Sequence, residues 1–230
     1  QFFVEDEQIA NDLVIIEGSD VNHIRNVLRM KCGEKVRISS TSGRNFFGTI
    51  DRIAENVVEV CITEETALDT ELPCRICLFQ GLPKSDKMEL IIQKAVELGA
   101  AEMIPVAMKN CVVKLDAKKA AAKTARWQEI AKSAAKQSKR SRIPVVREPV
   151  NYREAVALAG ELDVVLLPYE NERGMAATRE VMERIAPGQS VGIFIGPEGG
   201  FAPEEIEAVK GEMKLISLGS RILRTETAGF

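Results

Sequence analysis

Residues 190–201 read SVGIFIGPEGGF, and this stretch decides the fold class of the second part of the chain. Its first half is apolar without the alternation of a half-exposed strand, which is typical of a strand buried on both faces of a parallel sheet. The run then enters a loop with three glycines, one proline and one carboxylate, Glu198, and a helix is expected from Pro203. The stretch therefore predicts an α/β domain with a glycine-rich loop at the carboxyl end of a strand.

The same alternation of strand and helix continues on both sides of this stretch. From Met88, apolar residues recur at i, i+3, i+4, i+7 and i+8, which is the pattern of an amphipathic helix. Asp86 and Glu89 have the spacing of a capping box, and Gly99 suits a left-handed helix end. We expect a parallel sheet covered by helices on both faces, with strands in the segments 75–82, 102–108, 143–148, 163–168, 190–196 and 214–219.

The first part of the chain has a different pattern, and we place a domain boundary at Leu72-Pro73. Residues 1–72 then form one domain and residues 73–230 the other. One helical stretch, 19–30, interrupts short segments that are rich in β-branched residues and separated by turn residues. Strands are expected at 34–40, 44–53 and 57–65. Several short strands in a segment of this length predict a small β-barrel.

The composition excludes several classes of protein. Of 230 residues, 45% are hydrophobic and 28% charged, and no apolar stretch is long enough for a membrane helix. Five cysteines, an odd number in a chain without a secretory signal, are typical of reduced thiols, so we expect a cytoplasmic protein. Cys74 and Cys77 lack a second pair or a histidine cluster to complete a zinc site, and no metal is expected.

Charge is unevenly distributed along the chain, whose formal net charge is −3. Residues 1–72 hold 7 basic and 14 acidic side chains, whereas the remainder holds 24 and 20. Most of the basic excess lies in residues 109–147, where 12 basic side chains are opposed only by Asp116 and Glu129. This segment is a candidate RNA contact, although a Lys-rich helix is most often a solvated face.

Three strand ends carry unusual loops, at 164–171, 192–200 and 215–227. Ligands of open α/β sheets lie beyond the carboxyl ends of the strands, so these loops are candidates for one site. The glycine loop lacks the spacing of dinucleotide or P-loop motifs, and Glu198 would repel a pyrophosphate. A carboxylate among glycines suits a ligand with hydroxyls, an amine and a positive charge, such as S-adenosylmethionine. The alternative is a tight turn in which Glu198 caps the helix from Pro203.

The third loop favours a ligand site over a turn. In this loop Arg221 and Arg224 flank the apolar pair Ile222-Leu223 directly after a buried strand. Thr225 as the cap of a following helix explains part of the pattern but not the two arginines. Two unusual loops on neighbouring strand ends therefore predict a site.

IGPEGGF and LGSRILRTETA, with KMELIIQKAVELG and QSKRSRIP upstream, resemble the ribosomal RNA small subunit methyltransferase E family. HIRNVLRMKCGEKV also resembles the N-terminal PUA-like RNA-binding barrel of that family, so the resemblance spans nearly the whole chain. The family belongs to the SPOUT class of S-adenosylmethionine-dependent RNA methyltransferases. The resemblance implies a C-terminal SPOUT domain with a deep trefoil knot, which periodicity cannot predict.

The resemblance also implies an activity and partners. The family methylates N3 of one uridine of 16S ribosomal RNA in the assembled small ribosomal subunit, with S-adenosylmethionine as cofactor. It works as a homodimer with the active site at or near the subunit interface. Relatives continue past the position of Phe230 into a helix that belongs to the knot and the dimer interface.

Carried over residue by residue, the cofactor pocket draws on the ends of three strands. The residues implied are Leu167, Pro168, Ile195, Gly196, Pro197, Glu198, Gly199, Gly200, Leu218, Gly219, Ile222, Leu223, Arg224 and Thr225.

Candidate RNA contacts come from two segments. Arg140 and Arg142 lie in a short turn before a strand and match the family's Q-S-x-R motif, so we expect both to bind phosphate or a base. Arg25 and Arg29 lie on the predicted helix 19–30 and are weaker candidates, because the surrounding part of the chain is acidic. Trp127 is expected to be a core residue.

Methylation of uracil N3 requires that the ring lose a proton, so the site needs a base or cations that stabilise the anionic ring. As a hypothesis, Arg224 or the partner subunit's Arg140 supplies the positive charge, and Glu198 orients the cofactor or assists the proton. Two other functions remain open at this point. One is a ribose 2′-O-methyltransferase of the SPOUT class, and the other is a ribosome-assembly factor that binds RNA without catalysis.

Overall fold

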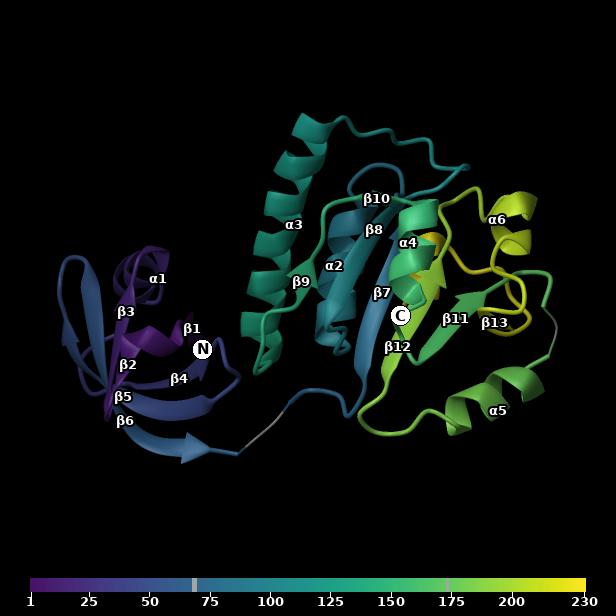
Figure 1. The fold of residues 1–230 in the computed structure, drawn as a ribbon. Helices are drawn as coiled ribbons and strands as arrows, with labels where there is room; N and C mark the ends of the chain where they lie inside the picture. Colours follow the sequence, from purple (N-terminus) through teal and green to yellow (C-terminus); the bar gives the residue numbers. More distant parts are fainter. Residues whose placement is uncertain (68–69, 173) are drawn as a thin grey trace. The chain divides into compact units, whose positions relative to one another are not determined.

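A computed structural model of the chain describes residues 1–67, 70–172 and 174–230. The chain divides into two compact units, which are drawn in Figure 1. Unit 1 consists of residues 1–71 and 135–143, and unit 2 of residues 72–134 and 144–230. Unit 1 therefore takes a second stretch of chain from the middle of the sequence, and this stretch contains the QSKRSRIP motif except for its last residue, Pro144.

Unit 1 is built on a six-stranded sheet with the order β1-β4-β5-β6-β3-β2. Only β1 and β4 pair in parallel, and the other neighbours are antiparallel. Its elements are β1 (Phe2–Val4), η1 (Asp6–Gln8), β2 (Ile9–Ala10), β3 (Leu13–Glu17), α1 (Ser19–Asn22), η2 (His23–Val27), β4 (Lys35–Ser40), β5 (Asn45–Ile53) and β6 (Val57–Thr66). The three strands expected from the sequence are confirmed within one residue at each end.

The core of unit 1 shows why the sheet curls. Phe2 on β1 and Ile9 on β2 lie on the two outermost strands of the sheet, yet both pack against the same apolar cluster. Ile38, Phe46 and Val60 from the strands between them lie in this cluster with at most 1% of their surface exposed. The sheet must therefore wrap around its own side chains, as expected of a small barrel.

The helical stretch predicted at 19–30 is shorter than expected and irregular. α1 is followed by the π-helical turn η2, which ends before Leu28. Arg29 then adopts a left-handed backbone with φ of 54°, which no helix interior accommodates. The element buries Asp20, Val21 and Ile24, and the other residues of α1 and η2 are exposed.

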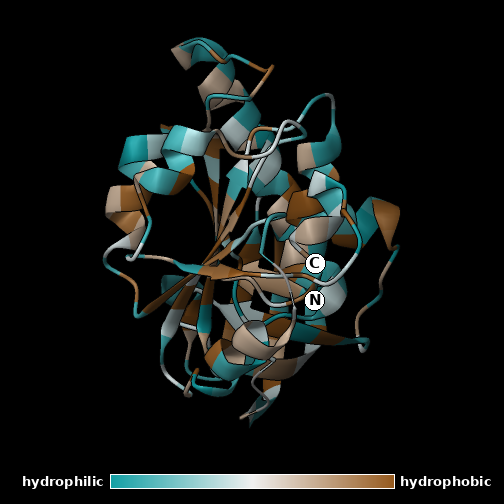
Figure 2. Cartoon of the chain, turned by 90° about the vertical axis from the view of Figure 1, so that its right-hand side faces the viewer, coloured by the Kyte–Doolittle hydropathy of each residue, from teal (hydrophilic) through white to brown (hydrophobic). Residues whose placement is uncertain are grey.

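Unit 2 is built on a parallel sheet with the order β10-β8-β7-β12-β11-β13, and β9 pairs with β8. Its strands are β7 (Arg75–Gly81), β8 (Glu102–Ala107), β9 (Val145–Val146), β10 (Val150–Asn151), β11 (Val164–Pro168), β12 (Ser190–Ile195) and β13 (Lys214–Ile216). Successive residues of β7 and β8 are buried, so both faces of the sheet are covered, as the near-continuous apolar runs predict. Figure 2 shows the strands mostly in the brown of hydrophobic residues and the helices with much teal.

The helices of unit 2 follow the strands in alternation. They are α2 (Lys87–Glu97), α3 (Ala117–Ser138), α4 (Tyr152–Ala159), α5 (Ala176–Glu183), α6 (Pro203–Glu207) and α7 (Thr225–Ala228), and the last turn of α3 belongs to unit 1. The predicted apolar face of α2, from Met88 to Val96, is buried, and Gly99 has a φ of 102° as expected. The predicted capping box is wrong, because Asp86 makes no side-chain cap bond and Glu89 pairs with Arg126 instead.

The order of the strands positions the candidate site. β12 lies between β7 and β11, so three carboxyl ends that are distant in sequence come together at one edge. The segment after β13 returns to this edge, because α7 packs against α2. The knot expected from the family stays a prediction. Within the three described stretches, no helix combines the length and the apolar character needed to cross a bilayer.

Candidate functional site

A pocket of about 310 Å³ lies at the carboxyl ends of β11 and β12 in unit 2. The three loops singled out in the sequence all contribute to it, which is the arrangement that the sheet order produces. Its lining residues are Lys87, Pro168, Tyr169, Glu170, Ile195, Gly196, Pro197, Glu198, Gly200, Phe201, Ile222, Leu223, Arg224, Thr225, Glu226 and Ala228. Ten of these belong to the predicted cofactor set.

Thr225 joins the last segment of the chain to the strand ends. Its hydroxyl donates to the Gly196 carbonyl at 2.6 Å and accepts from the Gln80 side-chain amide at 2.9 Å. Thr225 and Gln80 are both buried. The expectation that Thr225 caps a helix is wrong, because Arg224 is the N-cap residue of α7 and the Thr225 hydroxyl points inward. The buried bonds instead fix α7 over the ends of β7 and β12.

Glu198 is held by the segment before α2 rather than by the helix that follows it. Its carboxylate accepts from the Lys84 backbone N–H at 3.1 Å and lies 3.1 Å from the Lys87 ammonium. The alternative that Glu198 caps α6 is wrong. Glu205, a buried side chain, accepts from the Ala202 N–H at 2.8 Å and performs that role.

These partners set the ionisation of Glu198. Partial burial acts to raise the pKa of its carboxyl, but backbone N–H groups and the Lys87 ammonium outweigh that effect and lower it. A carboxylate with a lowered pKa and with hydrogen bonds already made is a weak proton acceptor at neutral pH. The geometry therefore suits a fixed negative charge in the pocket wall.

Lys87 is a pocket residue that the sequence did not reveal. It is the first residue of α2, and its ammonium also lies 3.0 Å from the Glu226 carboxylate on α7. The neighbouring carboxylates of Glu226 and then Glu198 raise the pKa of Lys87. The pKa of Glu226 is lowered, first by a backbone N–H and then by Lys87. The three side chains are therefore ionised together.

The glycines of the loop are favoured by close packing and by one left-handed position. A Cβ on Gly196 would lie 3.3 Å from the Gly200 backbone, and one on Gly199 would lie 3.0 Å from the Cβ of Asn110. Gly200 has a φ of +64°, which favours glycine. Asn110 also donates its side-chain amide to the Gly199 and Gly200 carbonyls, at 3.0 and 3.2 Å. Asn110 thus holds the loop from the side away from the pocket.

Four predicted cofactor residues do not line this pocket. Leu167 is fully buried in β11, one residue before the lining begins, and Gly199 faces Asn110. Leu218 is 40% exposed, and Gly219 has a φ of 109° in the turn after β13. Three of the six lining residues that were missed, Tyr169, Phe201 and Glu226, directly follow predicted ones and could have been found by extending each loop.

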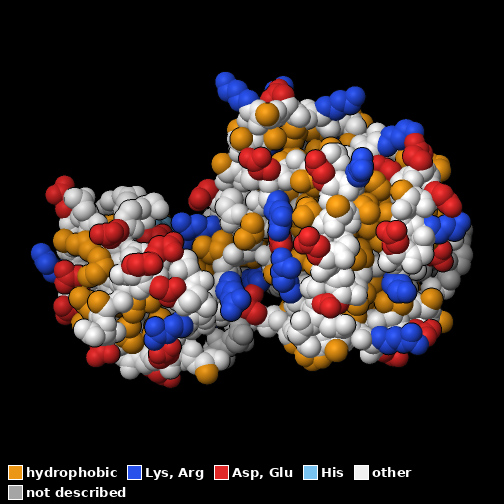
Figure 3. Space-filling model, in the orientation of Figure 1, with side chains coloured by type: hydrophobic (Ala, Val, Ile, Leu, Met, Phe, Trp, Pro, Cys, Tyr) orange, Lys and Arg blue, Asp and Glu red, His pale blue; other side chains and the backbone are white. Residues whose placement is uncertain are grey.

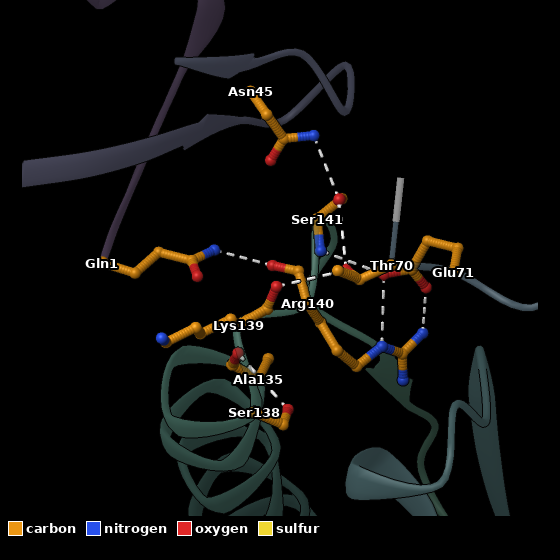
Figure 4. A network of polar contacts seen from close by, with 9 residues as sticks. All are labelled: Gln1, Asn45, Thr70, Glu71, Ala135, Ser138, Lys139, Arg140 and Ser141. Carbon is orange, nitrogen blue, oxygen red and sulfur yellow. Dashed lines mark hydrogen bonds and ion pairs between the residues drawn. The ribbon is translucent and has the colours of Figure 1, made fainter. Parts of the chain in front are cut away.

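Arg140 lies in a different environment from the one predicted. It is 3% exposed, and its guanidinium forms an ion pair with Glu71 within unit 1 (Figure 4). Glu71 also accepts from the Ser141 N–H at 3.0 Å, and the Ser141 hydroxyl accepts from Asn45 at 3.0 Å. The Arg140 carbonyl accepts from the Gln1 amide at 2.7 Å. Because its guanidinium is buried against a carboxylate, Arg140 is a structural residue here and does not present a cation to RNA.

Arg142, two residues later, is exposed. Its side chain crosses the turn between β4 and β5, where an added Cβ on Gly43 would lie 2.8 Å from its Nε. Arg25 is also exposed and donates to the Glu55 carbonyl at 2.8 Å, and Arg29 is exposed at the end of the helical stretch. Figure 3 shows acidic side chains gathered over unit 1 on the face in view.

Comparisons with known proteins agree with this architecture. A family model described as an RNA methyltransferase domain matches residues 70–230, and one described as an RNA methyltransferase PUA domain matches residues 16–60. The chain is 37% identical over 217 residues to the ribosomal RNA small subunit methyltransferase E of Bacillus subtilis, covering 93% of this chain and 85% of the relative. The protein of that name from Mesomycoplasma hyopneumoniae is 33% identical over 231 residues, covering 99% and 94%.

Solved structures show the same likeness. The ribosomal RNA small subunit methyltransferase E of Neisseria gonorrhoeae, bound to S-adenosyl methionine, superimposes with a TM-score of 0.83 at 31% identity, over 98% of this chain and 92% of that one. A Legionella pneumophila protein described as a methyltransferase, in complex with the cofactor SAM, gives a TM-score of 0.85 at 32% identity, over 99% and 92%. On identity, coverage and fold alike, the chain belongs to the ribosomal RNA small subunit methyltransferase E family.

Proposed function

We propose that this protein transfers the methyl group of S-adenosylmethionine to N3 of a uridine in 16S ribosomal RNA within the small ribosomal subunit. The observation that carries the proposal is the pocket in which three strand-end loops meet around Glu198. The names of the family relatives support ribosomal RNA as the substrate, and two of the similar structures contain the cofactor. The choice of N3 and of the assembled subunit rests on the family resemblance.

The pocket fits S-adenosylmethionine in size and charge. Its volume of about 310 Å³ is in the range of small-molecule sites. Among its described lining residues are three carboxylates and two cations, so the wall carries a net negative charge. S-adenosylmethionine is a net cation, because its sulfonium and amine outweigh its carboxylate. Ile195, Phe201 and Leu223 add apolar surface for an adenine ring.

The proposed roles of the side chains follow from their placement. When bound, the cofactor supplies an activated methyl group on its sulfonium. Glu198 and Glu226 provide fixed negative charge in the wall, and Thr225 holds the last segment in place. Arg224 is exposed at the pocket and is the cation we assign to the uracil ring as it loses the N3 proton to solvent. Arg140 is left out of this assignment, since Glu71 holds its guanidinium.

A homodimer is part of the proposal. Ile222, which lines the pocket, is 88% exposed, and Leu218, four residues earlier in the same loop, is 40% exposed. Large apolar side chains exposed at this level next to a site are typical of an interface. Light scattering of the purified chain should give twice the monomer mass, and Ile222→Glu should shift it toward the monomer.

The first experiment is a methylation assay with labelled S-adenosylmethionine and small ribosomal subunits from cells that lack this enzyme, followed by nucleoside mass spectrometry. We expect 3-methyluridine. Label on a ribose would instead identify a 2′-O-methyltransferase, and bound cofactor without label would favour the assembly-factor function. Arg224→Ala should reduce turnover strongly, whereas Arg221→Ala, an exposed arginine that does not line the pocket, should leave it unchanged.

A further inference from the structure

We infer that Lys87 is a positioning residue that holds the two walls of the cofactor pocket together through Glu198 and Glu226. This inference rests on the proposed function, because it concerns how the proposed cofactor pocket is held together. The three residues, here called the Lys87 cluster, come from α2, from the loop after β12 and from α7. All three line the pocket.

Glu198 and Glu226 depend on Lys87 to different degrees. Glu198 is also held by the Lys84 backbone N–H, at 3.1 and 3.3 Å from its two oxygens, so its position does not depend on Lys87 alone. For Glu226, Lys87 is the one ion-pair partner found in the described part of the chain. Removing the ammonium therefore releases α7 more than it releases the loop.

The charges of the three side chains also indicate that Lys87 holds the two acids together. Lys87 lies 3.1 Å from one carboxylate oxygen and 3.0 Å from the other, so the two acids approach each other only because one cation lies between them. Without that cation, two negative charges would face each other across a partly enclosed pocket, and they would repel. The segment held less firmly is α7, because it has four residues, is too short to be stable by itself, and is otherwise fixed by the Thr225 hydroxyl.

The consequence for binding is direct. α7 begins at Thr225, and its neighbours Arg224, Leu223 and Ile222 form one wall of the pocket. If α7 moves away from α2, this wall moves with it, and a ligand that contacts both walls loses one of them. Lys87 thus contributes to affinity by fixing the distance between the walls, whether or not it contacts the ligand itself.

The test compares Lys87→Met with Lys87→Arg and with a control on the same helix. Lys94→Met is the matched control, because Lys94 forms an ion pair with Glu97 at 2.6 Å on α2 and does not line the pocket. Hydrogen exchange of the protein without cofactor reports on residues 225–230, and calorimetry gives the affinity for S-adenosylmethionine. We expect Lys87→Met to speed exchange in 225–230 and to weaken binding about ten-fold. Lys94→Met should stay close to the unchanged protein, and Lys87→Arg, which keeps the positive charge, should retain more affinity and slower exchange than Lys87→Met.

A second substitution separates charge from mere packing. Lys87→Met combined with Glu226→Gln removes the repulsion between the two acids, so hydrogen exchange in residues 225–230 should slow relative to Lys87→Met alone. If the double variant is no better than the single one, or if Lys87→Met leaves exchange unchanged, the inference is wrong. Because exchange is measured without cofactor or RNA, this result is independent of the methylation assay. A protein that shows the exchange pattern but never forms 3-methyluridine would retain the Lys87 cluster and lose the proposed function.

Discussion

At the scale of single residues, Arg140 and Arg142 show how one short motif supplies two different roles. Arg140 is paired with Glu71 in the interior of unit 1, and Arg142 lies exposed across Gly43. An arginine that is buried against a carboxylate cannot be removed without leaving the carboxylate uncompensated. Removal of an exposed arginine leaves no buried charge behind. It should therefore change the free energy of unfolding little and affect mainly the affinity for a ligand.

The two arginines should therefore respond oppositely to substitution by alanine. Arg140→Ala is expected to lower the free energy of unfolding by about 3–5 kcal/mol, because the Glu71 carboxylate loses its buried partner. Arg142→Ala should leave the melting temperature near that of the unchanged protein. It should weaken RNA binding and reduce the slope of log affinity against log salt by about one. Thermal unfolding and binding at several salt concentrations measure both. Equal losses of stability in the two variants would contradict the assignment.

At the scale of elements, α7 depends on tertiary contacts for its existence. A helix of four residues does not form alone in water, because nucleation costs more than so few hydrogen bonds return. Its first residue, Thr225, bonds to Gly196 and Gln80 in the interior, and Glu226 binds Lys87. Helix α7 is thus held at the pocket by the neutral hydrogen bonds of Thr225 and by the ion pair of Glu226 with Lys87.

Thr225 makes the neutral hydrogen bonds. A substitution that keeps its shape but removes its hydroxyl therefore tests how much these bonds contribute to stability. Thr225→Val is expected to lower the free energy of unfolding by about 1–3 kcal/mol, because the buried Gly196 carbonyl loses its donor. Thr225→Ser keeps the hydroxyl and should lose less. Urea denaturation of both variants gives the comparison. A larger loss in Thr225→Ser than in Thr225→Val would show that the methyl group, and not the hydrogen bonds, decides stability here.

At the scale of the whole molecule, ionised carboxylates support both units. Hydrogen bonds from Ser42 lower the pKa of Asp6 in unit 1, and those from Ser190 lower the pKa of Asp163 in unit 2. Glu198 and Glu226 have lowered pKa values at the pocket. A carboxyl whose pKa is lower in the folded state than in the unfolded state binds fewer protons when folded. Its stabilising contribution is present above the unfolded pKa and is lost as the pH falls through the folded one.

Stability should therefore fall on the acid side. We expect the free energy of unfolding to change little on acidification to about pH 5 and to decrease below about pH 4, where unfolded carboxyls begin to bind protons. Asp163→Asn should flatten part of this decrease, since it removes one of the shifted groups. Denaturation midpoints measured as the pH is lowered test the sign. A rise in stability with acid would contradict the lowered pKa values.

The amino-acid sequence by itself determined the local pattern of this protein. Buried strands such as 190–195 read as continuous apolar runs because both faces are covered, and the barrel strands read as short β-branched segments between turns. The three loops of the pocket were visible because glycine, proline and charge after a buried strand have few structural explanations. The family motifs are contiguous in the sequence, so they too were visible.

Only the tertiary structure decided which charges meet. Lys87 precedes Glu198 and Glu226 by most of the length of unit 2. Glu71, which pairs with Arg140, precedes it by the whole of α2 and α3. Periodicity reports which face of an element is buried, but not which distant carboxylate a given cation will find. Such pairs form when strand order brings segments together, and that order depends on packing over the whole unit. For this reason the pocket loops were predicted, whereas the cation between them and the burial of Arg140 were not.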